Sequence, residues 1–562
     1  MNKFRYVTGA MLLVMWAAAY SAQPPRLVLQ ITVDQLRGDL PARHMDQFAK
    51  GGFRYLWERG IVFADAHHAH ANNETVVGHA TLATGADPAQ HGMIANLWFD
   101  REAGRTTYNI EDARYRLLTA GGDVDASTEI DPTQRAARSE GRSPRAILVN
   151  TFSDQLALHT AGRGKIFGVS VKDRGAVTMA GHAGKAFWFS KARGEFVTSS
   201  YYYDNYPQWV IDFNQAEPAK PYSGQSWGLL NNTSSYLFGK LDNRPWETDL
   251  AGFGRTFPHP YGTLDSKYFT TLLTVSPAGD QMTIEFAKRL LTAEGLGSDD
   301  VPDYLSVSLS STDYVGHVFG PSSLEAEDNL LRLDRALGDL FAFVDEHVGL
   351  QRTLIVLSAD HGSPEAPGYG LEMGIDGGYV HPDSWNTEGA IKSLQEAFGV
   401  TEELIERYSH PYIYLNRAVI AANGLDQAEV EAAVAKAVTD FAGVQVAISS
   451  SALRRDAVPD TPVFNAVKRN FNRRRSGDVY IVFKPNWFIN DFDGLTVAAT
   501  HGSPWRYDTY VPVVFAGAGM GRPKKVFRRI DTVDVAPTLS AILKIAPPAG
   551  AVGEPLVEVL GR

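Results

Sequence analysis

Residues 304–309 read Tyr-Leu-Ser-Val-Ser-Leu and residues 353–357 read Thr-Leu-Ile-Val-Leu, two short apolar runs typical of buried strands. Between them, apolar side chains recur with the spacing of a helix, which Gly349 ends. The recurring positions are Leu330, Leu333, Leu337, Leu340, Phe341 and Val344. A strand, a helix and a strand of these lengths predict a βαβ unit. We therefore expect an α/β fold with a mostly parallel central sheet flanked by helices.

Further strands are expected at residues 27–33 and 510–515. We expect residues 23–562 to form one catalytic domain with two large cap insertions, at about 97–280 and about 386–500. The first insertion includes a hairpin-like stretch, in which residues 186–189 turn at Arg193-Gly194 into residues 195–197. The second mixes helices with short strands.

Six residues of metal-ligating types fall at or near the ends of these strands. Asp34 follows the run at 27–33, Asp360-His361 follow the run at 353–357, and Asp313 and His317 are expected in the loop after 304–309. The sixth is His501. Ligands of open α/β sheets collect outside the carboxyl ends of the strands. The chain has no cysteine, so three Asp and three His predict two N/O sites that suit zinc, with manganese or cobalt as alternatives.

Thr75 is a candidate nucleophile. The run from Thr75 to Thr84 lacks proline and is followed by Gly85, which predicts a helix that begins near Thr75. A hydroxyl at a helix N-terminus feels the positive end of the dipole, and metal coordination would activate it further. The structural alternative for this residue is a helix N-cap.

Lys172 and Arg174 form a second candidate group, after the apolar run at residues 166–171. Two residues apart on an extended segment, their side chains would point the same way. Together they can pair with the oxygens of a phosphoryl group, the arginine in bidentate fashion.

These motifs, in this order, carry a family resemblance. Asp-x-x-x-His at 313–317, Asp-His-Gly at 360–362 and His-Gly-Ser-Pro at 501–504 follow Thr75 and the Lys-x-Arg at 172–174. With them the chain resembles the alkaline phosphatase superfamily, and within it the periplasmic bacterial alkaline phosphatases with a threonine nucleophile and a Lys-x-Arg motif. The resemblance covers essentially the whole chain after its first 22 residues.

The resemblance implies two zinc sites and a set of phosphate contacts. In that family one zinc is held by residues matching Asp313, His317 and His501. The other is held by residues matching Asp34, Asp360 and His361, together with the nucleophile matching Thr75. The residues that contact the phosphoryl group match Asn96, Lys172 and Arg174.

The activity so implied is hydrolysis of small phosphate monoesters through a phosphothreonine on Thr75, with release of inorganic phosphate. Two divalent ions about 4 Å apart can bind the attacking and the leaving oxygen of an in-line displacement. The nearest alternative is a nucleotide pyrophosphatase or phosphodiesterase of the same superfamily, in which the Lys-x-Arg pair is not expected. A sulfatase would need Cys or Ser in place of Thr75, and a non-catalytic phosphate-binding protein would not need Thr75 at all.

The N-terminus and the composition predict where the protein works. Lys3 and Arg5 precede an apolar run at residues 7–20, and small residues follow, so residues 1–22 read as a signal peptide cleaved after Ser21 or Ala22. We expect a periplasmic or secreted monomer with no membrane anchor after cleavage. The net charge of -11 argues against nucleic-acid binding.

Two other groups of residues are alternatives to the main site. His67, His68 and His70 could form a third metal site, and His79 could carry a proton, but a supporting or packing role is favoured for all four. Residues 491–494, Asp-Phe-Asp-Gly, could bind a structural calcium ion, although the motif falls far short of a calcium loop.

Overall fold

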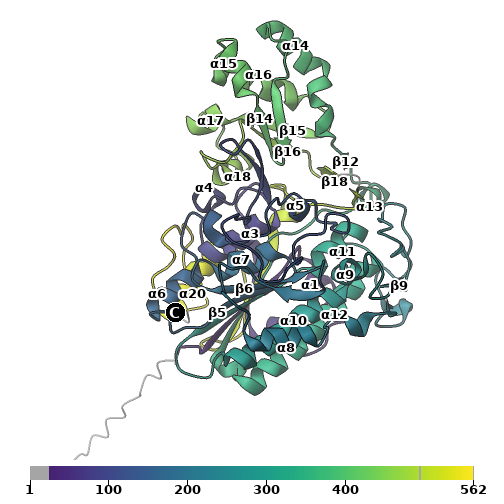
Figure 1. The fold of residues 1–562 in the computed structure, drawn as a ribbon, viewed down its shortest axis with the longest axis vertical. Helices are drawn as coiled ribbons and strands as arrows, with labels where there is room; N and C mark the ends of the chain where they lie inside the picture. Colours follow the sequence, from purple (N-terminus) through teal and green to yellow (C-terminus); the bar gives the residue numbers. More distant parts are fainter. Residues whose placement is uncertain (1–23, 493–494, 561–562) are drawn as a thin grey trace, which may run out of the picture.

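The computed structural model describes residues 24–492 and 495–560, and within them the core is a nine-stranded sheet (Figure 1). The strand order is β21-β2-β20-β11-β1-β10-β5-β6-β7. The strands are β1 (Leu27–Val33), β2 (Ile61–His67), β5 (Ile166–Ser170), β6 (Lys185–Ser190), β7 (Glu195–Val197), β10 (Asp303–Leu309), β11 (Thr353–Ser358), β20 (Tyr510–Gly517) and β21 (Lys524–Asp531). Strand β1 pairs in parallel with β10 and β11, whereas β20 and β7 run antiparallel to their neighbours. The mostly parallel α/β sheet is therefore confirmed.

Both faces of this sheet are buried, which explains the continuous apolar runs of its strands. Leu29 and Ile31 of β1 belong to the same apolar cluster as α10 (Pro277–Glu294) and α12 (Leu324–His347). Val28 points the other way, into a cluster with α6 (Phe152–His159) and α20 (Val535–Leu543). Figure 1 shows α10 and α12 beneath the sheet and α3 (Thr75–Thr84) and α7 (Asp173–Ala180) above it.

The segment at about 97–280 differs from the expected cap. Its strands β5, β6 and β7 belong to the central sheet, so part of this segment is core. The pairing of β6 with β7 confirms the hairpin expected at 186–197. Strand β5 is apolar, pairs with β10 and is buried on both faces. It therefore extends the central sheet and does not cover it.

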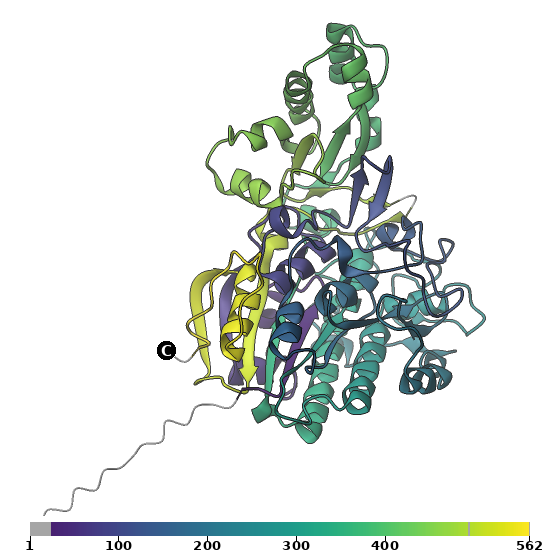
Figure 2. The same cartoon turned by 60° about the vertical axis from the view of Figure 1, so that its left-hand side comes forward.

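Residues within the second segment, at about 386–500, build a separate lobe that stands above the main sheet in Figures 1 and 2. Its antiparallel sheet has the order β13-β14-β16-β15. These strands are β13 (Ile405–Ser409), β14 (Tyr412–Leu415), β15 (Val444–Ser449) and β16 (Val479–Phe483). The helices α14 (Gly389–Phe398), α16 (Gln427–Thr439) and α18 (Pro462–Asn470) pack in the same lobe.

Two expectations concern residues that the structure does not describe in full. The signal peptide at residues 1–22 lies outside the described residues, and so does part of the calcium-loop candidate at 491–494. Among the residues that are described, no helix combines the length and the apolar character that crossing a membrane requires.

Candidate active site

The first group of metal-type side chains lies at the carboxyl end of two adjacent parallel strands. Asp34 follows β1, and Asp360 and His361 follow β11. Because β1 and β11 pair in register, with Thr32 opposite Ser358, the residues that follow them leave the sheet side by side. One ligand atom from each of Asp34, Asp360 and His361 lies within 4.8 Å of the others, and all three side chains are buried.

The second group is Asp313, His317 and His501, whose ligand atoms also lie within 4.8 Å of one another. Asp313 and His317 were expected in a loop, and that expectation is wrong, since both lie on α11 (Ser311–Phe319). A separation of four residues places them on the same helix face, and Asp313 Oδ1 is 3.2 Å from His317 Nε2. The rings of His361 and His501 stack with centroids 3.6 Å apart, so the two groups adjoin.

Thr75 is buried at the first position of α3. The N-cap is Glu74, so the alternative of Thr75 as a helix N-cap is wrong. The helix approaches the first group closely because Gly78 has no side chain. A Cβ at this position would lie 1.9 Å from the carbonyl oxygen of Asp360. The sequence Thr75-Val76-Val77-Gly78 therefore brings a helix N-terminus, with its hydroxyl, against the end of β11.

Lys172 links the two groups of metal-type residues. Its Nζ is 2.7 Å from Asp34 Oδ2 and also forms an ion pair with Asp313. Burial would lower the pKa of this ammonium, but Asp313 and Asp34 outweigh burial and raise the pKa above its ordinary value. Lys172 therefore holds its positive charge between the two groups.

Arg174 contacts the candidate nucleophile directly. Its Nη2 donates a 3.3 Å hydrogen bond to Thr75 Oγ1, and its Nη1 donates a 2.7 Å bond to Asp131. The expected extended segment is wrong at this position, because Lys172 is the N-cap of α7 and Arg174 lies in its first turn. Even so, both side chains reach the same site. The Arg174 Nε is buried and makes no hydrogen bond within the described residues.

Asn96 approaches the same helix N-terminus from the loop after α4 (Pro88–His91). Its Oδ1 accepts a 3.0 Å hydrogen bond from the backbone N–H of Val76. The backbone N–H of Asn96 donates a 2.6 Å hydrogen bond to the Glu74 carboxylate. The bond to Val76 fixes the orientation of the amide group, which leaves the two N–H donors of its Nδ2 for other partners.

The buried charges of the two groups are strongly perturbed. Burial and Asp313 would raise the pKa of Asp34, but Lys172 and His361 reverse this and hold the pKa below its usual range. Burial would lower the pKa of His361, but Asp360 and Asp34 raise it to about 9. Burial, reinforced by His361, lowers the pKa of His501 to about 3. Perturbed carboxylates and imidazoles that converge in this way are typical of functional sites.

Three residues that contact this site were not among the residues predicted from the sequence. Gln35 donates from its Nε2 to Asp313 (3.1 Å) and from its backbone N–H to Asp360 (3.2 Å), so it touches both groups. Its φ of 67° is in the left-handed region, which is uncommon for a residue other than glycine. Asp131 and Glu74 orient Arg174 and Asn96. Gln35 and Glu74 each carried one signal, their places directly after Asp34 and directly before Thr75.

The four additional histidines do not form a third metal cluster within the described residues. His79 bonds the backbone oxygen of Thr75 and the hydroxyl of Ser308, and its Nδ1 is 3.1 Å from Asp360. The other three are held by neighbouring groups as well. His67 bonds Asp65, His68 bonds the carbonyl of Ala359, and His70 bonds the carbonyl of Asn72.

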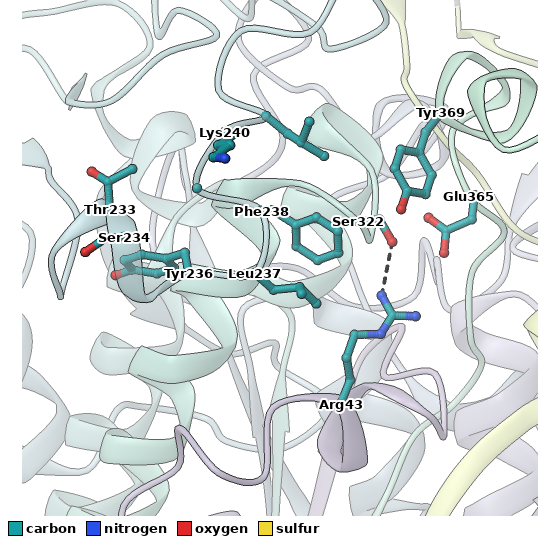
Figure 3. A pocket seen from close by; sticks show the side chains of 12 residues that line it. Arg43, Thr233, Ser234, Tyr236, Leu237, Phe238, Lys240, Ser322, Glu365 and Tyr369 are labelled. Carbon is teal, nitrogen blue, oxygen red and sulfur yellow. Dashed lines mark hydrogen bonds between the residues drawn. The ribbon is translucent and has the colours of Figure 1, made fainter.

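A small cavity of about 80 Å³ opens onto this site. It is lined by Asn96, Arg174 and the whole group Asp313, His317 and His501. A larger cavity of about 710 Å³ lies elsewhere and is shown in Figure 3. There Arg43 donates to Ser322, and none of the six metal-type residues lines that cavity. We assign the chemistry to the smaller cavity, because the perturbed groups converge there.

The donor sets fit two divalent cations. Each group offers carboxylate oxygens and imidazole nitrogens, which are the ligands that zinc takes when thiolates are absent. The first group holds two buried carboxylates and one imidazole, and oxygens of Asp34 and Asp360 make no hydrogen bond within the described residues. Buried carboxylates are costly unless they are paired, and bound cations would add to the pairing that Lys172 gives Asp34 and His79 gives Asp360.

Comparison with known proteins agrees with this geometry. A family model described as type I phosphodiesterase / nucleotide pyrophosphatase matches residues 28–504. The chain is 33% identical to alkaline phosphatase PafA of Elizabethkingia meningoseptica, over 96% of this chain and 95% of PafA. It is equally similar, at 33%, to a protein of Myroides odoratus named calcium-transporting ATPase, over 97% of this chain and 96% of that protein.

Solved structures give the same result. The wild-type PafA crystal structure superposes with a TM-score of 0.87 at 32% identity, over 96% of this chain and all of that chain. A PafA variant has also been solved, with substitutions at a threonine, an asparagine, a lysine and an arginine. The chain belongs to the type I phosphodiesterase / nucleotide pyrophosphatase family, within the alkaline phosphatase superfamily.

Proposed function

We propose that this protein is a metal-dependent alkaline phosphatase that hydrolyses small phosphate monoesters through a phosphothreonine intermediate on Thr75. The observation that carries this proposal is the pair Lys172 and Arg174. Both are buried, Arg174 in contact with Thr75 and Lys172 between Asp34 and Asp313, and the Arg174 Nε has no hydrogen-bond partner within the described residues. A monoester dianion has three non-bridging oxygens, and a site with Lys172, Arg174 and Asn96 supplies a donor for each of them.

The relatives support the same assignment. PafA is an alkaline phosphatase, and the substituted positions in its variant have the residue types and sequence separations of Thr75 with Asn96 and Lys172 with Arg174. We infer that these four residues contact the phosphoryl group here.

The reaction would proceed in two displacements. The Thr75 Oγ bonds to phosphorus as the bond from phosphorus to the ester oxygen breaks, and the leaving group departs as an alcohol. Water then attacks the phosphothreonine, which releases inorganic phosphate and restores the Thr75 hydroxyl. Lys172, Arg174 and Asn96 hold the non-bridging oxygens throughout. This is the main demand of phosphoryl transfer, whose loose transition state needs positioning and charge stabilisation.

We propose zinc as the bound metal, held by Asp34, Asp360, His361 and Thr75 at one site and by Asp313, His317 and His501 at the other. When bound, two such ions supply Lewis-acid stabilisation of charge on the attacking and leaving oxygens. Manganese or cobalt would suit the same donors.

The place of action follows from the same reading of the chain. A signal peptide at residues 1–22 would direct the protein to the periplasm or beyond, where it would act as a monomer on small phosphate esters. Residues 23–562 would then be the mature catalytic domain.

A phosphodiesterase or nucleotide pyrophosphatase is the second candidate, because the description of the matching family names those activities. The two candidates differ in the number of charged oxygens that the site must hold, since a diester has one oxygen fewer to offer Lys172 and Arg174.

The deciding experiment compares kcat/KM for p-nitrophenyl phosphate with that for bis-p-nitrophenyl phosphate. The proteins compared are zinc-loaded wild type, the double variant Lys172→Ala/Arg174→Ala, and a matched control. Arg522→Ala/Lys524→Ala is that control, because these two residues are also two apart but exposed. We expect a large monoester preference in wild type and in the control that shrinks or reverses in the site variant. A diester preference in wild type would establish the phosphodiesterase or nucleotide pyrophosphatase function. No turnover of either ester would favour a non-catalytic phosphate-binding protein.

A further inference from the structure

The cavity over the candidate site is lined by both polar and apolar side chains. Arg174 and Asn96 line it where the phosphoryl group would bind, and Ile130, Val318 and Leu495 line it as well. Val318 is 3% exposed, whereas Ile130 and Leu495 are partly exposed and pack against the main apolar cluster. Apolar side chains in the lining of such a cavity offer a surface against which an apolar part of a ligand can be buried.

The apolar side chains lie on the side where the leaving group would depart. The cavity is lined by Asp313, His317 and His501 but by none of Asp34, Asp360 and His361. We call Ile130, Val318 and Leu495 the apolar wall of the cavity. Val318 directly follows His317 in the sequence, so the wall includes a neighbour of this group. In an in-line displacement the leaving oxygen departs opposite the attacking oxygen. Because the group of Asp313 lines the cavity and the group of Asp34 does not, the substituent of that oxygen would lie in this cavity, with Ile130, Val318 and Leu495 among its neighbours.

Rigid elements hold this wall in place. Val318 belongs to α11 and Leu495 to β19 (Leu495–Thr496). Thr248 ties the two together, since its N–H donates to the Val318 carbonyl and its hydroxyl donates to the Thr496 carbonyl, each over 2.8 Å. The Ala498 N–H then donates a 2.8 Å bond to the His317 carbonyl. A wall fixed in this way does not need to be ordered when a ligand binds.

Three polar side chains in the lining of this cavity, Thr133, Glu74 and Tyr314, already take part in hydrogen bonds. The Thr133 hydroxyl donates a 2.6 Å bond to Asp131, which in turn holds Arg174. The Glu74 carboxylate accepts from the Asn96 N–H. The hydroxyl of Tyr314, also in the lining, accepts a 3.1 Å bond from Lys191. Hydroxyl groups of a polyol placed here would lose water and find few new partners, whereas an apolar group would lose nothing.

We infer that Ile130, Val318 and Leu495 form a leaving-group subsite that selects monoesters of aromatic or alkyl alcohols over monoesters of polyols such as sugars and glycerol. This inference rests on the proposed phosphomonoesterase function. The subsite changes which ester is cleaved faster and leaves the phosphoryl contacts of Thr75 and Arg174 as they are.

The test measures kcat/KM for phenyl phosphate and for glycerol 3-phosphate and follows their ratio across variants. Intrinsic reactivity of the two esters cancels when ratios are compared. Val318→Thr keeps the shape of the side chain and adds a hydroxyl, and Leu495→Asn places a polar amide on β19. Leu371→Asn is the matched control, since Leu371 is 61% exposed and does not line this cavity.

We expect the phenyl-to-glycerol ratio to fall by about 10-fold in each site variant, the effect of one apolar contact in a specificity pocket. The control should keep the wild-type ratio, and the inhibition constant of inorganic phosphate should stay the same in all four proteins. A ratio that is unchanged in both site variants, while wild type hydrolyses both esters, overturns the subsite and leaves the proposed function intact. Wild type that hydrolyses neither ester overturns both.

Discussion

Arg174 lies between Asp131 and Thr75, with one terminal nitrogen 2.7 Å from the Asp131 carboxylate and the other 3.3 Å from the Thr75 hydroxyl. Asp131 is itself the N-cap of α5 (Pro132–Arg135) and accepts bonds from the N–H groups of Thr133 and Gln134. The N-terminus of α5 therefore holds the Asp131 carboxylate, and this carboxylate orients the Arg174 guanidinium that would bind the phosphoryl group.

Asp131→Asn should reduce catalysis without removing any group that touches the substrate. The amide is neutral and cannot form an ion pair with Arg174. The guanidinium would then be free to turn. We expect kcat/KM for p-nitrophenyl phosphate to fall by about 10- to 100-fold, the usual result of small misplacements in a preorganised site. The ratio of monoester to diester turnover should fall with it. Asp131→Glu, which retains the charge, should recover part of the loss, and a full loss in that variant would contradict a charge-based role.

Gly78→Ala should separate helix α3 from the end of β11. An added Cβ would lie 1.9 Å from the carbonyl oxygen of Asp360, so backbone must move. Overpacking of this kind costs about 1–3 kcal/mol of stability, and here it also displaces Thr75. Thermal unfolding should report the first effect and p-nitrophenyl phosphate turnover the second. Gly389→Ala is the control, because a Cβ there meets nothing within 4 Å. Equal behaviour of the two variants would show that the close approach of α3 has no consequence.

His361→Ala should lower the bound metal from two ions per chain to one. This residue is one of three ligand candidates in its group, and the separate group of Asp313 keeps its own three. Elemental analysis of protein dialysed against zinc measures the stoichiometry directly. His159→Ala, at an exposed position, should keep both ions. A chelator should abolish wild-type turnover and lower the melting temperature, because ligands that bind only the folded state stabilise it. Two ions retained in His361→Ala would exclude the proposed ligand set.

A buried acidic pair away from the active site should make stability depend on pH. Burial raises the pKa of Glu325 to about 8, with Asp242 and Asp328 adding to the effect, and burial together with Glu325 raises the pKa of Glu247 to about 8. The facing imidazole, His259, is 3.3 Å from Glu325, but burial lowers its own pKa.

The sign of this dependence follows from proton counting. Between the ordinary pKa of a glutamate, about 4.3, and the raised value, the folded state binds more protons than the unfolded state. Stability is therefore fully present below that range and is lost as the pH rises through 8. One such group contributes at most about 1.4 kcal/mol per pH unit. Glu325→Gln should flatten the fall of the free energy of unfolding between pH 5 and pH 8. An equal slope in wild type and variant would show that Glu325 is ionised in the folded protein.

The spacing of apolar residues predicted several strands and helices, because this spacing reflects local structure. The apolar run at 353–357 and the helical spacing from Leu330 to Val344 correspond to β11 and α12. The same reasoning misplaced Asp313 and His317 in a loop. A short helix that follows a strand directly leaves no separate periodic signal, although the four-residue separation of the pair suits a helix face.

Residue types and their order along the chain were enough to name the groups available, namely three Asp, three His, one Thr and a Lys-x-Arg, and the strands that several of them follow. Which of these groups meet depends on the fold. Gln35 contacts Asp313 and Asp360 across more than 270 residues of chain, and Lys172 joins Asp34 to Asp313. Such contacts depend on how strands pair and how closely helices approach, as Gly78 shows. Residue types and local periodicity do not encode those distances, because they arise from the packing of the whole sheet.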